Sequence, residues 1–279
     1  MRRVLTSLGI VLIAFALVWL YFIFPGMAKL PEDYTAEYRF EGTVQVFNPS
    51  TGSLVPINTK MERTLDATGV NDAGALIIQQ VIKFTEATSG APLSAINPAL
   101  AALDSTETYA VDRSTRENVT GGDKSRSGQF TFPADVQQET YQVWSATTGS
   151  ALPATFVREE TIQGVKVYTF NIDSKGNAYP AAANGAPQTV DVFTIISVEP
   201  ISGTPVFTTS KTTINMQVAP TTSIPVLINE ITFTDDTVED AAEEGAANRN
   251  LILVASVYAF WGAIGLGLVL LVIGVTRKS

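Results

Sequence analysis

The sequence predicts a mainly β, antiparallel domain made of two related modules, with one transmembrane α-helix at each end of the chain. Three observations support this prediction. Two long uncharged apolar stretches lie near the ends, the segment between them consists of short β-type runs separated by Gly and Pro, and a pattern in its first half recurs in its second. The 279 residues include 18 Lys+Arg and 27 Asp+Glu, which gives a formal net charge of −9.

The two apolar stretches have the length of membrane-spanning helices. Residues 4–24 form a run of 21 residues without a charge, and residues 251–275 form a run of 25. At about 1.5 Å per residue, either run crosses a hydrocarbon core of roughly 30 Å. The tails beyond them contain the basic residues Arg2, Arg3, Arg277 and Lys278. The positive-inside bias therefore predicts that both termini are cytoplasmic and that the intervening segment is extracytoplasmic.

A cleavable signal peptide is the alternative for the first stretch, with a small-residue cleavage site at residues 26–28. The apolar region of a signal peptide is about 7–15 residues long, and this stretch is longer. We therefore expect an uncleaved anchor.

The second stretch contains a row of small residues, Ala255, Ala259, Ala263 and Gly267, spaced four apart on one helix face. Small side chains allow helix backbones to approach closely in lipid. We expect this face to pack against the first stretch, through Gly9 or Ala16, or against another protein or a second copy. The alternative is that Ala and Gly are simply common in membrane helices.

The segment between the stretches reads as β structure. Residues 43–47, 77–82, 165–170 and 190–195 are rich in β-branched and aromatic side chains and predict strands, whereas 97–103 and 236–247 are the expected short helices.

An internal repeat divides this segment into two β modules, at residues 29–128 and 129–234. Residues 43–64 and 140–161 share nine identities in 22 positions at a shift of 97. The repeat predicts two strand–turn–strand units with Gly52 and Gly149 at equivalent turn positions. Chance similarity between two β-hairpins is the alternative.

Residues 235–250 form an acidic juxtamembrane segment, with six acidic side chains between positions 235 and 244. We expect a solvated stalk that the anionic head groups of the membrane repel. A cation-dependent contact with a basic partner or with polysaccharide-bound Ca²⁺ is the alternative interpretation.

Seven aromatic side chains lie close together in the second module, and the default expectation is that they form its core. A groove for an acyl chain or a sugar is the functional alternative. Its expected lining residues are Phe130, Phe132, Tyr141 and Trp144.

The composition excludes several classes of chemistry. The chain has no Cys and no His, so it has no disulfide, no thiolate nucleophile, no Cys/His zinc site and no Ser-His-Asp triad. The intervening residues 27–250 contain 14 basic and 27 acidic residues, and this charge of −13 argues against nucleic acid as a partner. No phosphate- or dinucleotide-binding loop, EF-hand or G-x-S-x-G motif occurs. Lys and Ser occur together within residues 124–127, where a catalytic Ser-Lys dyad is conceivable. We expect this segment to be a polar loop that joins the modules. We therefore predict that the protein is not an enzyme and binds no cofactor or metal ion.

Several strings carry a family resemblance: YAVDR at 109–113, FTFPADV at 130–136, TYQVW at 140–144, PA at 153–154 and EETIQGVKVYTF at 159–170. Together with the two terminal helices, they resemble the actinobacterial envelope family labelled "PorA-family porin". The resemblance covers roughly residues 31–170 and the two-helix layout. It implies a membrane-anchored β ectodomain in the prokaryotic cytoplasmic membrane, exposed in the cell envelope.

These observations predict a non-enzymatic envelope protein that serves as a structural or accessory subunit of a membrane or surface assembly. The alternative is a protein that binds or transfers a lipid or lipoglycan through a hydrophobic groove or tunnel, since two terminal helices around a β ectodomain resemble the layout of scavenger-receptor class B proteins. Porin activity is not expected, because a lipid-spanning barrel has charge-poor strands and does not require two helical anchors.

Overall fold

The computed structural model describes residues 2–24 and 29–276. The chain divides into two compact units. One contains the two ends of the chain, residues 1–29 and 246–279, and is helical; the other contains residues 30–245 and is mainly β. Each unit is described by itself below.

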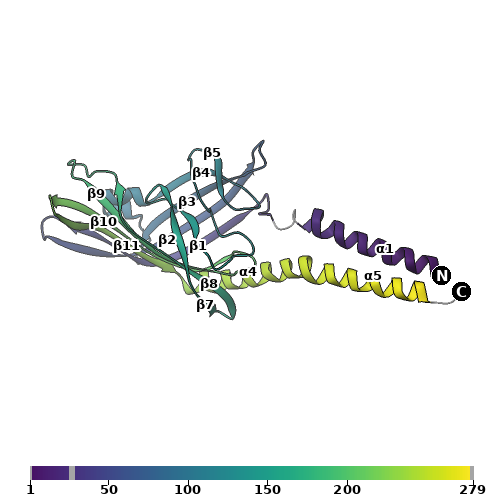
Figure 1. The fold of residues 1–279 in the computed structure, drawn as a ribbon. Coiled ribbons are helices and arrows are strands. Elements are labelled where there is room, and N and C mark those ends of the chain that lie inside the picture. Colours follow the sequence, from purple (N-terminus) through teal and green to yellow (C-terminus); the bar gives the residue numbers. More distant parts are fainter. Residues whose placement is uncertain (1, 25–28, 277–279) are drawn as a thin grey trace. The chain divides into compact units, whose positions relative to one another are not determined.

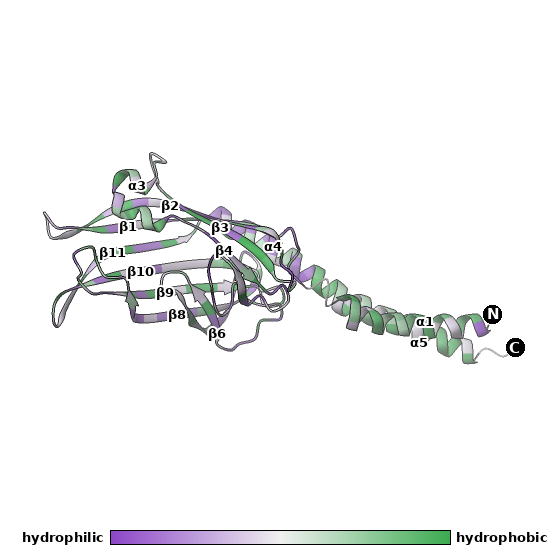
Figure 2. Cartoon of the chain, turned by 90° about the horizontal axis from the view of Figure 1, so that it is seen from above, coloured by the Kyte–Doolittle hydropathy of each residue, from purple (hydrophilic) through white to green (hydrophobic). Residues whose placement is uncertain are grey.

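The helical unit is an antiparallel pair of apolar helices. Helix α1 (Arg2–Val18) continues into a π-helical turn, η1 (Trp19–Ile23), and a second such turn, η3 (Val254–Tyr258), precedes α5 (Ala259–Thr276). Figure 2 shows that hydrophobic residues run along both helices. The helical segments Arg3–Ile23 and Asp235–Thr276 are each long and apolar enough to cross a membrane, which agrees with the expected spans at 4–24 and 251–275.

The two π-helical turns meet each other in this helix pair. The indole N–H of Trp19 donates a hydrogen bond of 2.8 Å to the backbone carbonyl of Ala255. A π-helical turn disturbs the regular i to i−4 ladder. Because lipid offers no hydrogen-bond partners, a carbonyl near such a turn benefits from a side-chain donor.

The β unit is built from eleven strands and a few short helices (Figure 1). The strands are β1 (Thr35–Asn48), β2 (Ser53–Val70), β3 (Leu76–Glu86), β4 (Ser105–Val111), β5 (Asn118–Gly122), β6 (Tyr141–Ser145), β7 (Ser150–Ile162), β8 (Val165–Tyr179), β9 (Gln188–Val198), β10 (Pro205–Ala219) and β11 (Thr222–Phe233). Helix α3 (Leu93–Ile96) and the 3₁₀ turn η2 (Pro98–Leu103) lie between β3 and β4. The expected strands fall within β1, β3, β8 and β9, and the expected helix at 97–103 is the 3₁₀ turn.

The strands form one antiparallel sheet in the order β5-β4-β3-β2-β1-β11-β10-β9-β8-β7-β6. Its two edges are joined by a short closing segment, residues 128–130. Gln129 makes an antiparallel bridge to Glu117, which precedes β5, and a parallel bridge to Val143 in β6. Hydrogen bonds of 2.8 Å from the Asn118 amide to the Gly128 carbonyl and of 2.6 Å from the Gln129 amide to the Gln142 carbonyl support these bridges. The sheet is therefore a closed up-and-down barrel.

The barrel interior contains two groups of buried apolar side chains. The first group comes mostly from β1 to β4 and β11 and includes Phe40, Leu65 and Ile78. The second comes mostly from β6 to β10 and includes Phe170 and Val192. Successive side chains of a strand point to opposite faces, so along β2, for example, the buried Met61 and Leu65 are each followed by an exposed acidic residue, Glu62 and Asp66.

Helix α4 (Asp235–Leu253) starts directly after β11. The hydroxyl of Thr234 accepts a 3.2 Å hydrogen bond from the Thr237 amide, and Asp235 and Asp236 occupy the first turn, where carboxylates stabilise the helix dipole. The six acidic side chains of residues 235–244 are all exposed, as expected. The segment is not a free stalk, however, because Val238 belongs to the first apolar group and Gly245 lies against the side chains of Glu199 and Val206.

The two expected modules, residues 29–128 and 129–234, are the two halves of this single barrel. They share one sheet and lie in one compact unit. The duplicated pattern corresponds to the hairpins β1–β2 and β6–β7, whose turns have the same geometry: Gly52 has φ +66° and Gly149 has φ +63°, and the amide of each donates a 2.9 Å hydrogen bond to the carbonyl four residues earlier. Whether the halves arose by duplication stays a prediction.

Candidate ligand-binding site

A cavity of about 270 Å³ lies inside the barrel. Its lining alternates along the strands, as in positions 38 and 40 of β1, 61, 63 and 65 of β2, 192, 194 and 196 of β9, and 208, 210 and 212 of β10. This period of two means that the cavity is bounded by the inward face of the sheet. Eight strands enclose an interior that side chains just fill or that holds one small ligand. Eleven strands enclose more space, and this barrel does not fill it.

Most lining residues are apolar, and three of the four expected groove residues are among them. Phe130, Phe132 and Trp144 line the cavity. Tyr141 does not, but its ring packs edge-on against Phe132, with ring centroids 5.2 Å apart, and its hydroxyl accepts a 2.8 Å hydrogen bond from the Gln137 amide. The aromatic cluster thus belongs both to the core and to the cavity wall.

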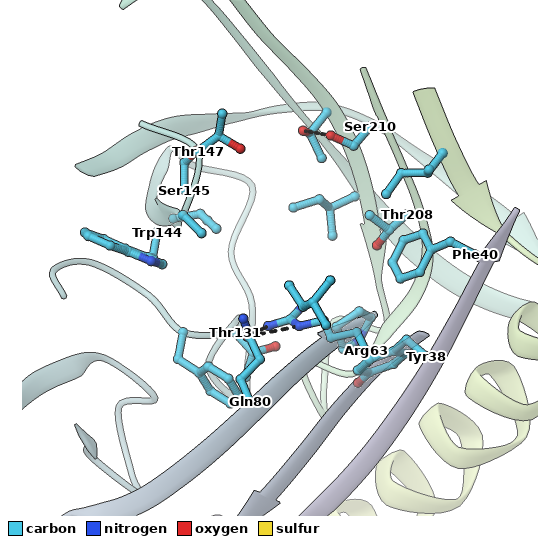
Figure 3. A pocket seen from close by; sticks show the side chains of 18 of the residues that line it. Tyr38, Phe40, Arg63, Gln80, Thr131, Trp144, Ser145, Thr147, Thr208 and Ser210 are labelled. Atoms are coloured by element: carbon cyan, nitrogen blue, oxygen red, sulfur yellow. Dashed lines mark hydrogen bonds between the residues drawn. The ribbon is translucent and has the colours of Figure 1, made fainter. Parts of the chain in front are cut away.

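One wall of the cavity carries a polar cluster centred on Gln80. The side-chain oxygen of Gln80 accepts hydrogen bonds from Nε of Arg63 at 3.2 Å and from Nη2 at 2.9 Å, and a third from the Tyr109 hydroxyl at 3.3 Å. Figure 3 shows Arg63 and Gln80 together on this wall, across the cavity from Thr208 and Ser210. Arg63 lies between Met61 and Leu65 on the inward face of β2. A guanidinium is therefore placed among inward side chains that are mainly apolar.

A second guanidinium, that of Arg126, extends this cluster. It forms an ion pair of 2.5 Å with Glu107 and lies over the Tyr109 ring, 3.5 Å from the ring centroid and 5.7 Å from that of Trp144. Arg126 is only 8% exposed. The polar loop expected at residues 124–127 therefore contains a buried residue, because this part of the chain turns Arg126 into the barrel beside Tyr109.

Three buried polar atoms on the cavity wall have no hydrogen-bond partner among the described residues: Nε of Arg126, Nε1 of Trp144 and the hydroxyl oxygen of Thr131. Two of them are donors only. Leaving a buried donor unpaired costs about 1–3 kcal/mol. Such atoms are therefore natural contact points for a ligand with acceptor oxygens.

The tyrosines around the guanidiniums stay uncharged. Burial raises the pKa of Tyr109, and the charges of Arg63 and Arg126 oppose the shift. Burial also raises the pKa of Tyr34 and of Tyr38, which line the same cavity. At neutral pH none of these phenols provides a negative charge that could balance Arg63.

The small-residue row of the second span is divided by the π-helical turn. Gly267 lies against α1, where an added Cβ would be 2.7 Å from Cγ1 of Ile13 and 3.0 Å from the carbonyl oxygen of Gly9. Ala255 is buried and Ala263 is half-buried. Ala259 is exposed in this helix pair, because the π-helical turn at Val254–Tyr258 bonds residue i to i−5 instead of i−4 and rotates the residues that follow. Packing of the whole row against another protein or a second copy stays a prediction.

No cluster of three or more His, Cys, Asp or Glu side chains that could bind a metal ion is found among the described residues. The site is thus a mainly apolar cavity with a cationic, donor-rich wall.

Fold and cavity together define a class of protein, in which a closed β-barrel with a ligand-sized interior is combined with two helices of membrane-spanning type. A family model described as "Porin PorA" matches residues 3–276, and the chain belongs to this family. The match extends the resemblance seen at residues 31–170 to nearly the whole chain. A search of curated proteins gives no significant match. A porin family name fits a membrane protein of the cell envelope.

Sequence reasoning missed the polar wall. Arg63 and Gln80 occupy inward positions in strands whose other inward residues are apolar, and that alternation was the available signal. Arg126 gave no such signal, because glycines and serines surround it.

Proposed function

We propose that the barrel binds one amphipathic molecule, with an alkyl chain in the cavity. The observation that carries this proposal is the unfilled interior of an eleven-stranded barrel, lined mainly by inward apolar side chains with polar atoms on one wall. Ligand sites are typically concave, mostly apolar and provided with a few oriented polar groups. This favours the lipid-binding alternative of the sequence analysis over a purely structural subunit.

The size of the cavity sets the kind of ligand. Pockets for small molecules usually measure about 300–1,000 Å³, and this one measures about 270 Å³. Such a volume suits a single alkyl chain rather than a whole two-chain lipid. A larger lipid or lipoglycan would be bound through one chain only.

The outer face of the barrel suits water. Arg39 pairs in register with Glu62 across β1 and β2, and Glu41 pairs with Lys60; all four side chains are exposed. Strands that face lipid carry apolar side chains instead, and a charge there is costly. We therefore propose that this barrel is an extracytoplasmic domain and not a pore through lipid, with both termini of the chain in the cytoplasm.

Photo-crosslinking tests the proposal. The full chain, in nanodiscs of zwitterionic lipid, is irradiated with a diazirine-bearing fatty acid, and labelled peptides are mapped by mass spectrometry. We expect label on peptides of the cavity wall, such as those containing Ile172 and Val192, in addition to label on the membrane helices.

A matched pair of variants makes the test specific. Ser210→Trp adds a large side chain at a cavity position of β10, whereas Lys211→Trp adds it at the neighbouring exposed position. Ser210→Trp should abolish labelling of the barrel and Lys211→Trp should preserve it. Equal labelling of both variants, or none in the unmodified chain, contradicts the proposal.

The accessory-subunit role is the second candidate. One observation favours it: an added Cβ at Gly262 or Gly265 would meet no described atom within 4 Å, so part of α5 stays open for another helix. A chain that purifies from mild detergent as a lone monomer, without any co-purifying protein, counts against this role. We propose no catalytic activity for either role.

A further inference from the structure

We infer that the ligand of the barrel is an anion whose head group, a carboxylate or a phosphate, binds at Arg63 beside Arg126, Trp144 and Thr131. This inference rests on the proposed function and specifies its ligand class. An apolar cavity by itself could hold an uncharged ligand. The charges and hydrogen-bond donors of one wall are what favour an anion.

The charged side chains of the cavity wall are all cationic. Of the described residues that line the cavity, only Arg63 and Arg126 are charged, and both are cationic. Glu107 neutralises Arg126 through the 2.5 Å ion pair. Arg63 contacts the neutral amide of Gln80, and none of the ion pairs between described side chains includes it. Among the charged side chains of the described lining, Arg63 is therefore the one without an ion-pair partner.

That charge is unusual for its surroundings. Residues 27–250 have a formal charge of −13, and their acidic groups are available to pair with any arginine on the surface. Arg39, for example, pairs with Glu37 on the outer face. A half-buried guanidinium without a counter-ion is disfavoured in an apolar interior unless a ligand supplies one.

The unpaired polar atoms of the same wall are hydrogen-bond donors. Nε of Arg126 and Nε1 of Trp144 can only donate, and the Thr131 hydroxyl can donate as well. The Arg126 guanidinium lies 5.7 Å from the Trp144 ring centroid, so two of these donors are close together. A carboxylate or phosphate presents several acceptor oxygens and no competing cation, and its bonds to such donors are strong because they are charge-assisted.

The opposite wall provides for the alkyl chain. Ile172, Val192 and Ile196 come from β8 and β9 and point into the same cavity. The hydroxyls of Thr194 and Ser210 hydrogen-bond each other at 2.9 Å (Figure 3). None of the described lining residues from β8, β9 and β10 is charged. The head group is therefore expected at the wall formed by β2, β3, residues 126–132 and Trp144 of β6, with the chain directed toward β8 and β9.

Three photoactivatable probes with the same alkyl chain test this inference: a fatty acid, an alkyl monophosphate and the fatty alcohol. The full chain in zwitterionic nanodiscs is labelled with each. Label on α1 and α5 measures how much probe enters the membrane, so the ratio of barrel label to helix label corrects for partitioning. We expect both anionic probes to give at least about ten times the ratio of the alcohol.

Variants of Arg63 test whether this side chain binds the anionic head group. Arg63→Gln should lower the ratio for the anionic probes about tenfold and leave that of the alcohol within about twofold. Arg63→Lys, which keeps the charge, should retain most of the anion preference. Arg39→Gln is the matched control, because it removes an arginine from the exposed outer face, and it should change nothing.

The possible results distinguish a wrong ligand class from a wrong proposed function. If the alcohol labels the barrel as well as the anions do and Arg63→Gln has no effect, the anionic ligand is wrong while the proposed alkyl-binding function stands. If no probe labels the barrel, or if Ser210→Trp leaves labelling intact, the proposed function itself is wrong. If Arg63→Gln does not fold, the comparison of the three probes on the unmodified chain still decides.

Discussion

The hairpins β1–β2 and β6–β7 have the same turn and different consequences. In both, a threonine hydroxyl before the glycine contacts a serine hydroxyl after it, Thr51 with Ser53 at 2.8 Å and Thr148 with Ser150 at 3.0 Å. The position aligned with Arg63 at the shift of 97 is Glu160. Arg63 lines the cavity, whereas the Glu160 carboxylate is not among the described lining residues and accepts hydrogen bonds from Arg158 and Thr169.

A β-bulge contributes to this difference. The register of β7 against β8 shifts between Phe156 and Arg158, and β2 has no shift at the aligned position. A bulge inserts one residue and changes the face that later residues present. Local turn geometry can therefore recur in the two halves of a barrel while the charge of the interior is set by one side chain in one half.

The largest expected effect concerns the contact between the β9–β10 turn and residues 132–133, both in the second half of the barrel. Gly203 has φ +72°, and an added Cβ would overlap the carbonyl oxygens of Phe132 and Pro133. Gly203→Ala should cost about 3 kcal/mol, through backbone strain and overlap. For a unit of this size that lowers the barrel's melting temperature by roughly 6–12 °C, as measured by circular dichroism of the full chain. An unchanged melting temperature would mean that this close contact does not hold the β9–β10 turn against residues 132–133.

The next effect compares a crowded with an open glycine in the helix pair. Gly267→Leu should separate α1 from α5 by about 2 Å, because packed helix axes normally lie about 8–10 Å apart and glycine allows the closest approach. Gly262→Leu, at an open position, should not. The chain has no Cys, so cysteines introduced at the exposed positions Val11 and Val269 can be spin-labelled selectively. Double electron–electron resonance then measures the distance between the two labels. Equal distances in both variants would refute the packing role of Gly267.

A smaller and symmetric effect tests the shared turn. Gly52 and Gly149 both adopt the left-handed conformation, and an added Cβ at either meets no atom within 4 Å. Gly52→Ala and Gly149→Ala should therefore each lose about 1 kcal/mol from the backbone conformation alone. Denaturation of the two variants should give costs that agree within about 0.5 kcal/mol. Clearly different losses of stability in the two variants would show that the turns share their geometry but not their energetics.

The smallest effect concerns Glu160. The Thr169 hydroxyl, followed by Arg158, lowers the pKa of the Glu160 carboxyl in the folded chain. A carboxyl with a depressed folded pKa adds stability above its ordinary pKa and loses that stability as the pH falls. Between pH 6 and pH 3 the unmodified chain should therefore lose more stability than Glu160→Gln. The difference should stay below about 1 kcal/mol, because the side chain is partly exposed. Parallel pH profiles would contradict the assignment.

Local patterns made the elements of this fold predictable. Uncharged runs of sufficient length located the helices, β-branched runs located strands in β1, β3, β8 and β9, and the glycines of two similar strings located matching turns. The acidic residues of 235–244 are solvated, as their charge required. Each of these features depends on residues close together in the chain.

Closure of the barrel could not be predicted in this way. It depends on Phe40 pairing with Phe233, nearly the whole β unit apart, and on bridges at the single residue Gln129. The cavity follows from closure, so Arg63 could not be recognised as a cavity residue, and Arg126 looked like part of a polar loop. Ala259 lies away from the buried side of the helix pair because a π-helical turn, which no residue pattern indicated, changed the helical phase.

The pairing of β1 with β11 also fixes the order in which the barrel can be completed. Strand β1 is synthesised first among the strands, and its hydrogen-bonding partner β11 is synthesised last. Each intervening strand can pair with its predecessor as it appears, but one edge of β1 stays open throughout, and an open edge invites pairing with another chain. Glu37, Arg39 and Glu41 line that strand on its exposed face. Charged edges discourage such pairing, so we expect these side chains to lower aggregation of the nascent protein until its final strand is synthesised.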